Sequence, residues 1–236
     1  MGRNNYFKFK QFTIVHEKSG MKVGTDGVLI GAWATHHDAQ NILDIGCGSG
    51  LIPLMLAQRT SAHIVGVEID KLAAEESIDN VQKSPWTNRI EIVNKPIQEY
   101  QPEHTFDLIV SNPPYFTNGP MSPNQARKNA RHTDTLCFND LLSSAARLLK
   151  LDGSFCIILP AEHEKEITSM AADNNLHLNE VCYVKPKKEA APKRILFHFN
   201  FFKAEDPIQK EIFIEKERHV YSDDYIDLTK DFYLNM

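Results

Sequence analysis

Short apolar runs along the chain alternate with longer segments in which apolar residues recur at helical spacing. Runs of the first kind predict buried strands, and segments of the second kind predict amphipathic helices. The predicted strands lie near residues 41–46, 64–68, 90–94, 106–110, 154–159, 180–184 and 196–202. The predicted helices lie at 51–59, 71–83, 138–150 and 162–174. This alternation predicts an α/β fold in which a mostly parallel sheet lies between helical layers.

The segment before the first predicted core strand has smaller elements. Residues 12–16 and 21–24 have the pattern of a hairpin that turns at Lys18-Ser19-Gly20. Asp26 is in position to N-cap a helix that continues to Trp33. We therefore expect a hairpin and a helix to precede the sheet.

A glycine loop follows the strand near residues 41–46. The strand contains Asp44 and runs directly into three glycines, Gly46, Gly48 and Gly50. Glycines there allow a tight turn and let a ligand approach the backbone, with the next helix N-terminus facing it. The dinucleotide fingerprint needs its third glycine where Leu51 stands, so the spacing is instead that of S-adenosylmethionine enzymes. The next strand ends in Glu68, about twenty residues on, as a ribose-binding carboxylate should.

The tetrapeptide Asn112-Pro113-Pro114-Tyr115 ends the apolar strand near 106–110. Two prolines fix φ twice, so the loop is stiff and cannot continue the sheet ladder. The Asn112 side-chain oxygen and a neighbouring main-chain carbonyl can then both accept hydrogen bonds from one planar NH2 group. The Tyr115 ring can lie flat on the aromatic ring that carries this amine. The alternative is an ordinary strand-ending turn, because Asn-Pro often opens turns.

The glycine loop, the acid after it and Asn-Pro-Pro-Tyr, in this order, resemble the class I S-adenosylmethionine-dependent amino-methyltransferases. More closely, the chain is similar to the bacterial family that methylates adenine 37 of a valine tRNA on its exocyclic amine. This closer resemblance rests on residues 22–33, above all Gly24-Thr25-Asp26-Gly27, on the closing residues 231–234, and on the absence of an added domain. It covers nearly the whole chain.

The resemblance implies a Rossmann-like, doubly wound, mostly parallel sheet of seven strands, with the final strand reversed. Residues 181–184 and 195–202 would then form an antiparallel pair at the sheet edge. The resemblance also implies a single methyltransferase domain. Its parts would be an N-terminal hairpin and helix extension over 1–37, a catalytic core over 38–203 and a C-terminal extension over 204–236.

Site residues also follow from the resemblance. The catalytic set would be Asn112, Pro113, Pro114 and Tyr115. The cofactor, S-adenosyl-L-methionine, would be bound by Lys22, Thr25, Asp26, Asp44, Gly46, Gly48, Gly50, Glu68, Ile69, Pro96, Ile97 and Asn112. Asp26 would contact the amino-acid end of the cofactor or only cap its helix. Many relatives carry an Asp at the position of Pro96 that bonds the cofactor's adenine amine, so here a backbone group or Asn94 would have to substitute.

Charge is distributed unevenly, although the net charge is −5 and the pI is about 6.1. Three basic clusters stand out, at residues 3–10, 127–132 and 185–194, and Phe7 and Phe9 interleave with the first in a way that suits base stacking. Solvated loops would explain any one cluster. Three clusters around one pocket mouth would bind RNA, and the RNA-binding residues would be Lys8, Lys10, Arg127, Lys128, Arg131, Lys187, Lys188 and Arg194. Residues 116–133 are predicted to form a substrate loop.

Other features narrow the class of protein. No apolar run approaches the ~18 residues needed to span a membrane, and the N-terminus lacks a signal-peptide core. The four cysteines are far apart and the ten histidines show no ligand spacing, so we expect no metal. These observations predict a cytoplasmic enzyme with a tRNA substrate, and we expect a monomer.

Four alternative functions share parts of this pattern. A DNA adenine methyltransferase normally needs a target-recognition domain, and a protein-glutamine methyltransferase has a helical domain before its glycine loop. An rRNA guanine amino-methyltransferase is the nearest rival, and the sequence leaves it open. A binding module without turnover is disfavoured because the cofactor motif and the acceptor motif are both intact.

Overall fold

A computed structural model describes residues 4–19, 22–114 and 136–236. Within these residues one nine-stranded sheet has the order β11-β10-β8-β9-β7-β6-β3-β4-β5. Its strands are β3 (Asn41–Ile45), β4 (His63–Glu68), β5 (Ile90–Asn94), β6 (Phe106–Ser111), β7 (Leu149–Pro160), β8 (His177–Lys187), β9 (Arg194–Asn200), β10 (Ile208–Glu217) and β11 (Val220–Tyr221). The first five strands are parallel, and β9 lies antiparallel between β7 and β8. The predicted doubly wound α/β fold is confirmed.

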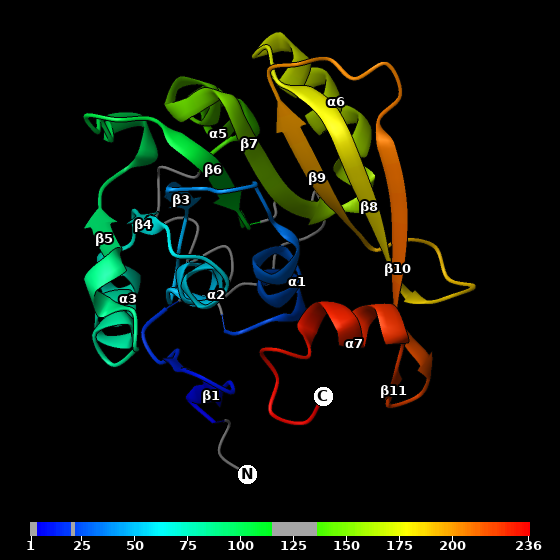
Figure 1. The fold of residues 1–236 in the computed structure, drawn as a ribbon, viewed down its shortest axis with the longest axis horizontal. Helices are drawn as coiled ribbons and strands as arrows, with labels where there is room; N and C mark the ends of the chain where they lie inside the picture. The colour runs from blue at the N-terminus through cyan, green and yellow to red at the C-terminus, as the bar shows by residue number, and fades with distance from the viewer. Residues whose placement is uncertain (1–3, 20–21, 115–135) are drawn as a thin grey trace, which may run out of the picture.

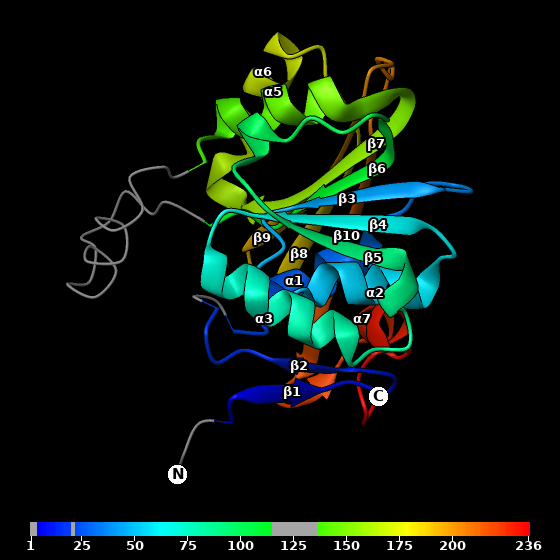
Figure 2. The same ribbon diagram turned by 90° about the vertical axis from the view of Figure 1, so that its left-hand side faces the viewer.

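Helices cover both faces of the sheet (Figures 1 and 2). They are α1 (Thr25–Trp33), α2 (Leu51–Arg59), α3 (Lys71–Gln82), α5 (Phe138–Leu148), α6 (Glu164–Asp173) and α7 (Asp223–Thr229), with short 3-10 turns η1 (Thr87–Arg89), η2 (Ile97–Glu99) and η3 (Ala161–His163). Helices α1, α2 and α3 lie on one face, and α5 and α6 lie on the other (Figure 2). Consecutive strand residues alternate between the two cores, as Ile42 and Leu43 of β3 do. None of these helices, which are all that the described residues contain, is long and apolar enough to cross a bilayer.

The C-terminal extension adds two strands that the sequence did not predict, so the sheet has nine strands and not seven. Strand β10 pairs in parallel with β8, and β11 pairs with the end of β10. The antiparallel pairing of β8 with β9 is confirmed, but their expected place at the sheet edge is wrong because β10 covers β8. Ion pairs Lys185–Glu211 and Lys210–Glu180 reinforce this added pairing.

The N-terminal hairpin exists, and its predicted strand over 12–16 is confirmed as β2, but the predicted partner strand and turn are wrong. Strand β1 (Tyr6–Lys8) pairs with β2 (Thr13–Val15), and residues 22–24 form no strand. The segment after β2 finds its partners on α3 instead. Glu76 accepts the backbone N–H groups of residues 17, 18 and 19 at 2.6, 2.7 and 3.0 Å. Asn80 bonds the backbone of Val15 in both directions, at 3.0 and 2.8 Å. Side chains of a helix therefore replace the strand that the pattern predicted.

Two further expectations about the N-terminal region are corrected. The N-cap of α1 is Gly24, which has no side chain to cap with, and Asp26 lies in the first turn. Phe9 is only 1% exposed and packs in a ring cluster with Phe7, Phe12 and Tyr233. These rings join the hairpin to the C-terminal tail, so they form core contacts and not a stacking surface for bases.

Candidate cofactor and acceptor site

The sheet brings the predicted site residues to one edge. Strands β4 and β6 flank β3, and Ile45 lies opposite both Val67 and Ser111. Gly46, Glu68 and Asn112 are the next residues of the three strands' chain segments. They therefore lie side by side at the carboxyl ends of these strands. The chain order reverses between β3 and β6, and ligands of open α/β sheets bind at the carboxyl ends of strands where such a reversal occurs.

The glycine loop has a backbone that only glycine adopts readily. Gly46, Gly48 and Gly50 have φ values of 78°, 54° and 83°. A Cβ at Gly46 or Gly48 would meet no atom within 4 Å, so both face open space. A Cβ at Gly50 would lie 2.5 Å from the Ser77 hydroxyl oxygen, so this glycine lets α2 approach α3. The first two glycines therefore border the space for a ligand, and the third allows close packing.

Glu68 fixes this loop from the end of β4. Its Oε2 accepts the Gly48 N–H at 2.8 Å, and its Oε1 accepts the Asp70 N–H at 2.8 Å. Burial raises the pKa of Glu68, and these two hydrogen bonds oppose that shift. Asp70 also N-caps α3 through the Ala73 N–H. Sequence reasoning missed Asp70, although an Asp directly before a helical pattern is a usual N-cap signal.

Asp44 lies in β3, the strand next to that of Glu68, and is 0% exposed. Neither of its carboxyl oxygens has a hydrogen-bond partner among the described residues. Burial, and secondly the charge of Glu68, raises its pKa well above the usual value. A buried carboxyl without a partner suits a ligand that carries positive charge, and the glycine loop that follows it borders the open space. These residues fit a cationic ligand with hydroxyl groups.

Cys47 has a packing role in the loop. It is 6% exposed, and its Sγ would lie 2.9 Å from a Cβ built on Gly66. Burial raises the pKa of the Cys47 thiol well above its usual value. The thiol is therefore held protonated, which agrees with a small residue in a tight turn and not with a nucleophile.

The predicted adenine side of the site lies beyond β4 and β5. The Asn94 side-chain nitrogen donates to the backbone carbonyls of Glu68 and Ile69 at 2.8 and 3.1 Å. These bonds leave the Asn94 side-chain oxygen as an acceptor. Ile69 is 45% exposed, and Pro96 precedes η2, whose Ile97 is buried. An apolar surface and an amide oxygen therefore lie together just before Pro96.

Asn112 stands beside the glycine loop and α1. The Ser111 hydroxyl donates to the Ile45 carbonyl at 2.8 Å and ties the end of β6 to β3. A Cβ at Gly27 would lie 3.8 Å from Asn112 Nδ2 and 2.9 Å from a methyl of Leu51. Gly27 thus lets α1 pack close to Leu51 of α2, with Asn112 at ordinary contact distance. No sequence signal identified this role of Gly27, because it depends on how α1 packs.

The rest of the tetrapeptide is described only in part. Pro113 is buried and Pro114 is exposed. Tyr115 lies outside the described residues, as do Arg127, Lys128 and Arg131.

Asp26 and Arg194, predicted for different ligands, form an ion pair at 2.8 Å. The pair joins the first turn of α1 to the start of β9, and both side chains are partly buried, 24% and 32% exposed. Lys22 and Thr25 are exposed at the start of α1. The structure therefore places these residues on one rim of the site.

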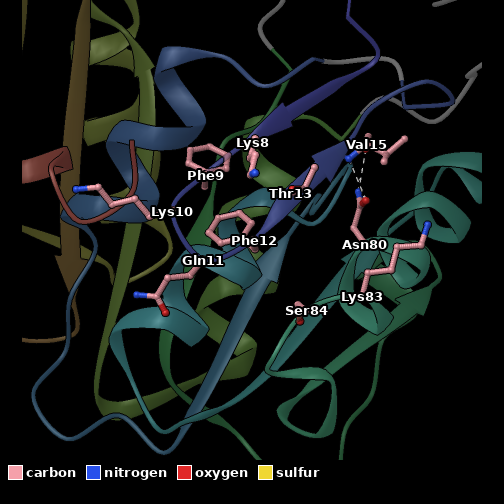
Figure 3. A pocket seen from close by; sticks show the side chains of 10 residues that line it. All are labelled: Lys8, Phe9, Lys10, Gln11, Phe12, Thr13, Val15, Asn80, Lys83 and Ser84. Atoms are coloured by element: carbon pink, nitrogen blue, oxygen red, sulfur yellow. Dashed lines mark hydrogen bonds between the residues drawn. The ribbon is translucent and has the colours of Figure 1, made fainter. Parts of the chain in front are cut away.

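The two basic clusters that the structure describes do not line the same hollow. Because β9 is antiparallel to both neighbours, β8 ends at the same sheet edge as β7, and exposed Lys187 and Lys188 lie there. Lys8 and Lys10 instead line a hollow of about 340 Å³ with Lys83, beyond the end of α3 (Figure 3). Asn80 of α3 also lines this hollow and donates to the Ser49 carbonyl of the glycine loop at 2.9 Å, so the hollow adjoins the loop through α3. Lys10 also donates to the Lys230 carbonyl at 2.6 Å.

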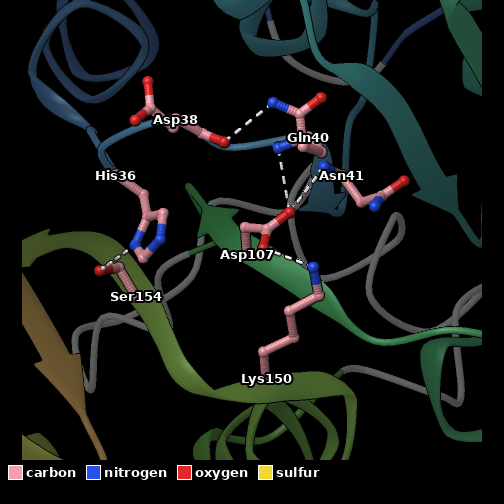
Figure 4. Close-up of polar contacts among 7 residues, drawn as sticks. All are labelled: His36, Asp38, Gln40, Asn41, Asp107, Lys150 and Ser154. Carbon is pink, nitrogen blue, oxygen red and sulfur yellow. Dashed lines mark hydrogen bonds and ion pairs between the residues drawn. The ribbon is translucent and has the colours of Figure 1, made fainter.

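A polar network braces the opposite edge of the sheet (Figure 4). Asp107 accepts from the backbone of Gln40 and Asn41 at 3.0 and 2.8 Å and from Lys150 at 2.5 Å. Burial acts to raise the pKa of Asp107, but these hydrogen bonds outweigh it and lower the pKa. The carboxylate is structural. Among the described residues, no three His, Cys, Asp or Glu side chains are grouped as a metal site would need.

Comparison with known proteins gives the family. A family model named methyltransferase small domain matches residues 8–173. A protein of Phocaeicola vulgatus named tRNA1(Val) (adenine(37)-N6)-methyltransferase is 49% identical over 233 residues, 99% of each chain. A protein of the same name in Bacteroides thetaiotaomicron is 46% identical over 99% of each chain. This chain belongs to the tRNA1(Val) (adenine(37)-N6)-methyltransferase family. Membership in this family confirms the predicted resemblance.

A solved structure shares the fold of this methyltransferase family member. A predicted O-methyltransferase of Agrobacterium tumefaciens superposes with a TM-score of 0.66 and 18% identity, over 88% of this chain and 96% of its own. At this identity the likeness concerns the fold alone. It agrees with the parallel sheet described above.

Proposed function

We propose that this methyltransferase transfers the methyl group of S-adenosylmethionine to the exocyclic amine of adenine 37 in a valine tRNA, the activity in its relatives' name. The observation that carries the proposal is the position of Asn112. It follows β6 directly beside the glycine loop that follows β3, so an acceptor amine and a cofactor would meet at one edge.

The cofactor supplies a methyl group made electrophilic by its sulfonium. Glu68 would accept hydrogen bonds from the ribose hydroxyls, while its bonds to the loop backbone hold it in place. Gly46 and Gly48 leave the space that the cofactor needs. Ile69 would flank the adenine, and the Asn94 side-chain oxygen would accept from its amine in place of the missing Asp.

The acceptor amine is a weak nucleophile because its lone pair is delocalised into the adenine ring. Hydrogen bonds from this amine to the Asn112 side-chain oxygen and the Pro113 carbonyl would aim the lone pair at the methyl group. They would also stabilise the positive charge that grows on nitrogen in the transition state. Holding the reacting atoms about 3–3.5 Å apart supplies the rest, and Tyr115 would stack on the base turned out of its strand.

The β8–β9 turn supports an RNA contact near this acceptor. Lys187 and Lys188 are exposed there, at the edge where Asn112 lies. Arg194 would contact the RNA from the same rim, where its ion pair with Asp26 holds it. Arg127, Lys128 and Arg131 follow the tetrapeptide in sequence, which supports a place for them near the same RNA.

We also propose that the chain acts as one domain, as a cytoplasmic monomer. The hairpin and the C-terminal tail both pack on the α1–α3 side, and the Lys10 N–H donates to the Phe232 carbonyl at 2.8 Å. A tRNA substrate agrees with a cytoplasmic location.

Incubation with labelled S-adenosylmethionine and either total RNA or protein extract tests the proposed function. The expected product is methyladenine in the tRNA fraction, with no label in protein. Methylguanine, or label in ribosomal RNA alone, would move the assignment to an rRNA guanine amino-methyltransferase. Label in protein glutamine would move it to a protein methyltransferase.

A further inference from the structure

Asp44 is the most unusual buried charge-bearing group in the described chain. It lies within β3, opposite Gly66 of β4 and Val110 of β6. Both its oxygens are enclosed, and neither has a hydrogen-bond partner among the described residues. The Ser111 hydroxyl, one residue along β6, is already used by the Ile45 carbonyl.

Among the described residues, the groups that face Asp44 do not supply positive charge. Glu68 comes from β4, and its charge disfavours a second negative charge on Asp44. Cys47 comes from the glycine loop, and its buried thiol is protonated. The Ser77 hydroxyl on α3 faces the Cys47 sulfur at 3.9 Å. An ionised carboxylate that is buried without a partner takes up a proton instead of staying charged.

Hydrogen bonds decide which of the two carboxyl groups holds the proton. Glu68 accepts two backbone N–H groups, and such bonds favour the charged form. Asp44 accepts none within the described chain. The proton therefore belongs on Asp44, and Glu68 keeps the charge.

We propose that Asp44 holds this proton until S-adenosylmethionine binds, and releases it to solvent when the positive charge of the cofactor is placed at the glycine loop. The carboxyl O–H bond breaks, its electron pair stays on Asp44, and water or buffer takes the proton. The proposal rests on the cofactor assigned under the proposed function, and it does not depend on the RNA acceptor.

One positive charge near the carboxyl group is enough to release its proton. An opposite charge within about 4–6 Å lowers a carboxyl pKa by about 1–3 units, and the glycine loop begins two residues after Asp44. Methyl transfer turns the sulfonium into a neutral thioether, so the charge that favoured ionisation disappears with the reaction. Asp44 then takes a proton back, so its ionised carboxylate contributes to binding of the cofactor but not of the demethylated product. Asp44 is thus a specificity residue for the charged cofactor.

Calorimetric titration without RNA tests this linkage. S-adenosylmethionine is titrated into the protein in buffers of different ionisation enthalpy at pH 6, 7 and 8, and the buffer dependence counts protons. We expect release of up to one proton per cofactor within this range, and less release with S-adenosylhomocysteine. Asp44→Asn should bind without this release. Asp38→Asn, an exposed aspartate outside the site, is the control and should match the wild type.

Three results would overturn the linkage. They are no buffer dependence in the wild type at any of the three pH values, an unchanged proton count in Asp44→Asn, and equal release with the two ligands. The last comparison uses only wild-type protein, so it decides the question even if Asp44→Asn fails to fold. A protein that shows the linkage but methylates guanine would retract the acceptor assignment alone, whereas a protein that does not bind S-adenosylmethionine would contradict both proposals.

Discussion

Glu68→Gln separates binding from folding at the cofactor site. The change keeps the size of the side chain, but an amide has one acceptor oxygen where the carboxylate has two. In the wild type each oxygen accepts one backbone N–H, from Gly48 and from Asp70, at 2.8 Å. In the variant one of these N–H groups must face an NH2 group, so the glycine loop loses one of its two supports.

The magnitude follows from the hydrogen bonds that the variant cannot make. A hydrogen bond to a charged group contributes about 1.5–3 kcal/mol, and ribose hydroxyls would lose the charged acceptor as well. Since about 1.4 kcal/mol is a factor of ten in affinity, S-adenosylmethionine should bind about 10- to 100-fold more weakly to Glu68→Gln. Burial already disfavours charge on Glu68, so the loss of folding stability should be the smaller effect.

Glu76→Gln is the matched control. Glu76 is also a buried glutamate that accepts backbone N–H groups, but it holds the hairpin segment and not the glycine loop. Burial acts to raise its pKa, and the hydrogen bonds outweigh burial and lower it. Its charged form is therefore stabilised by the fold, and Glu76→Gln should destabilise the protein by about 1.5–3 kcal/mol with cofactor affinity unchanged. Calorimetric titration and urea unfolding measure both quantities. Glu68→Gln binding within twofold of wild type would refute the reasoning.

The remaining predictions concern the acceptor, pH and RNA. Asn112→Ala should leave cofactor affinity within a few-fold and lower turnover by ~10² or more. Near-wild-type rates in single-turnover kinetics would contradict the proposed hydrogen bond from the acceptor amine to Asn112. Burial lowers the pKa of His198 in the folded protein, so His198 takes up a proton more readily in the unfolded chain. The stability that neutral His198 contributes is therefore fully present above the ordinary pKa of about 6.5. It is lost as the pH falls through the pKa of the folded protein. Urea unfolding from pH 8 to 5 should show this loss, and His198→Gln should reduce it; an unchanged pH profile would count against it. Reversing Lys187 and Lys188 to Glu should weaken tRNA binding. The slope of log affinity against log salt concentration should also become shallower by about 0.7 for each single-strand phosphate that is no longer neutralised. Unchanged affinity and slope in binding assays would show that the β8–β9 turn does not contact RNA.

Local patterns predicted the position of the candidate site residues better than that of their surroundings. The glycine loop, Glu68 and Asn112 each end a buried strand, and parallel strands bring such ends together without further information. The conformations of Gly46 and Gly48 follow from the same local pattern. These parts of the site depend on short sequence segments, so the sequence contains enough to place them.

Contacts between residues far apart in the sequence account for the features that the sequence did not predict. The pattern predicts a strand partner for the segment after β2, but its backbone bonds to Glu76 and Asn80 of α3, about 60 residues away. Arg194 pairs with Asp26 across 168 positions, a contact that the basic cluster around Arg194 does not predict. Strand β10 was missed because it lies near the sheet edge with many exposed polar residues and has a weak apolar pattern. Such interactions depend on the folded arrangement and leave no short-range signal.

Mass spectrometry of tRNA fragments tests the central claim most directly. Unmodified valine tRNA is incubated with S-adenosylmethionine and either the wild-type protein or Asn112→Ala, and the fragments are then analysed for added methyl groups. The account predicts one methyl group on the base of adenine 37 with the wild-type protein, and a rate lower by ~10² or more with Asn112→Ala. Methylation of a guanine, or of an adenine elsewhere in the tRNA with position 37 untouched, would contradict it.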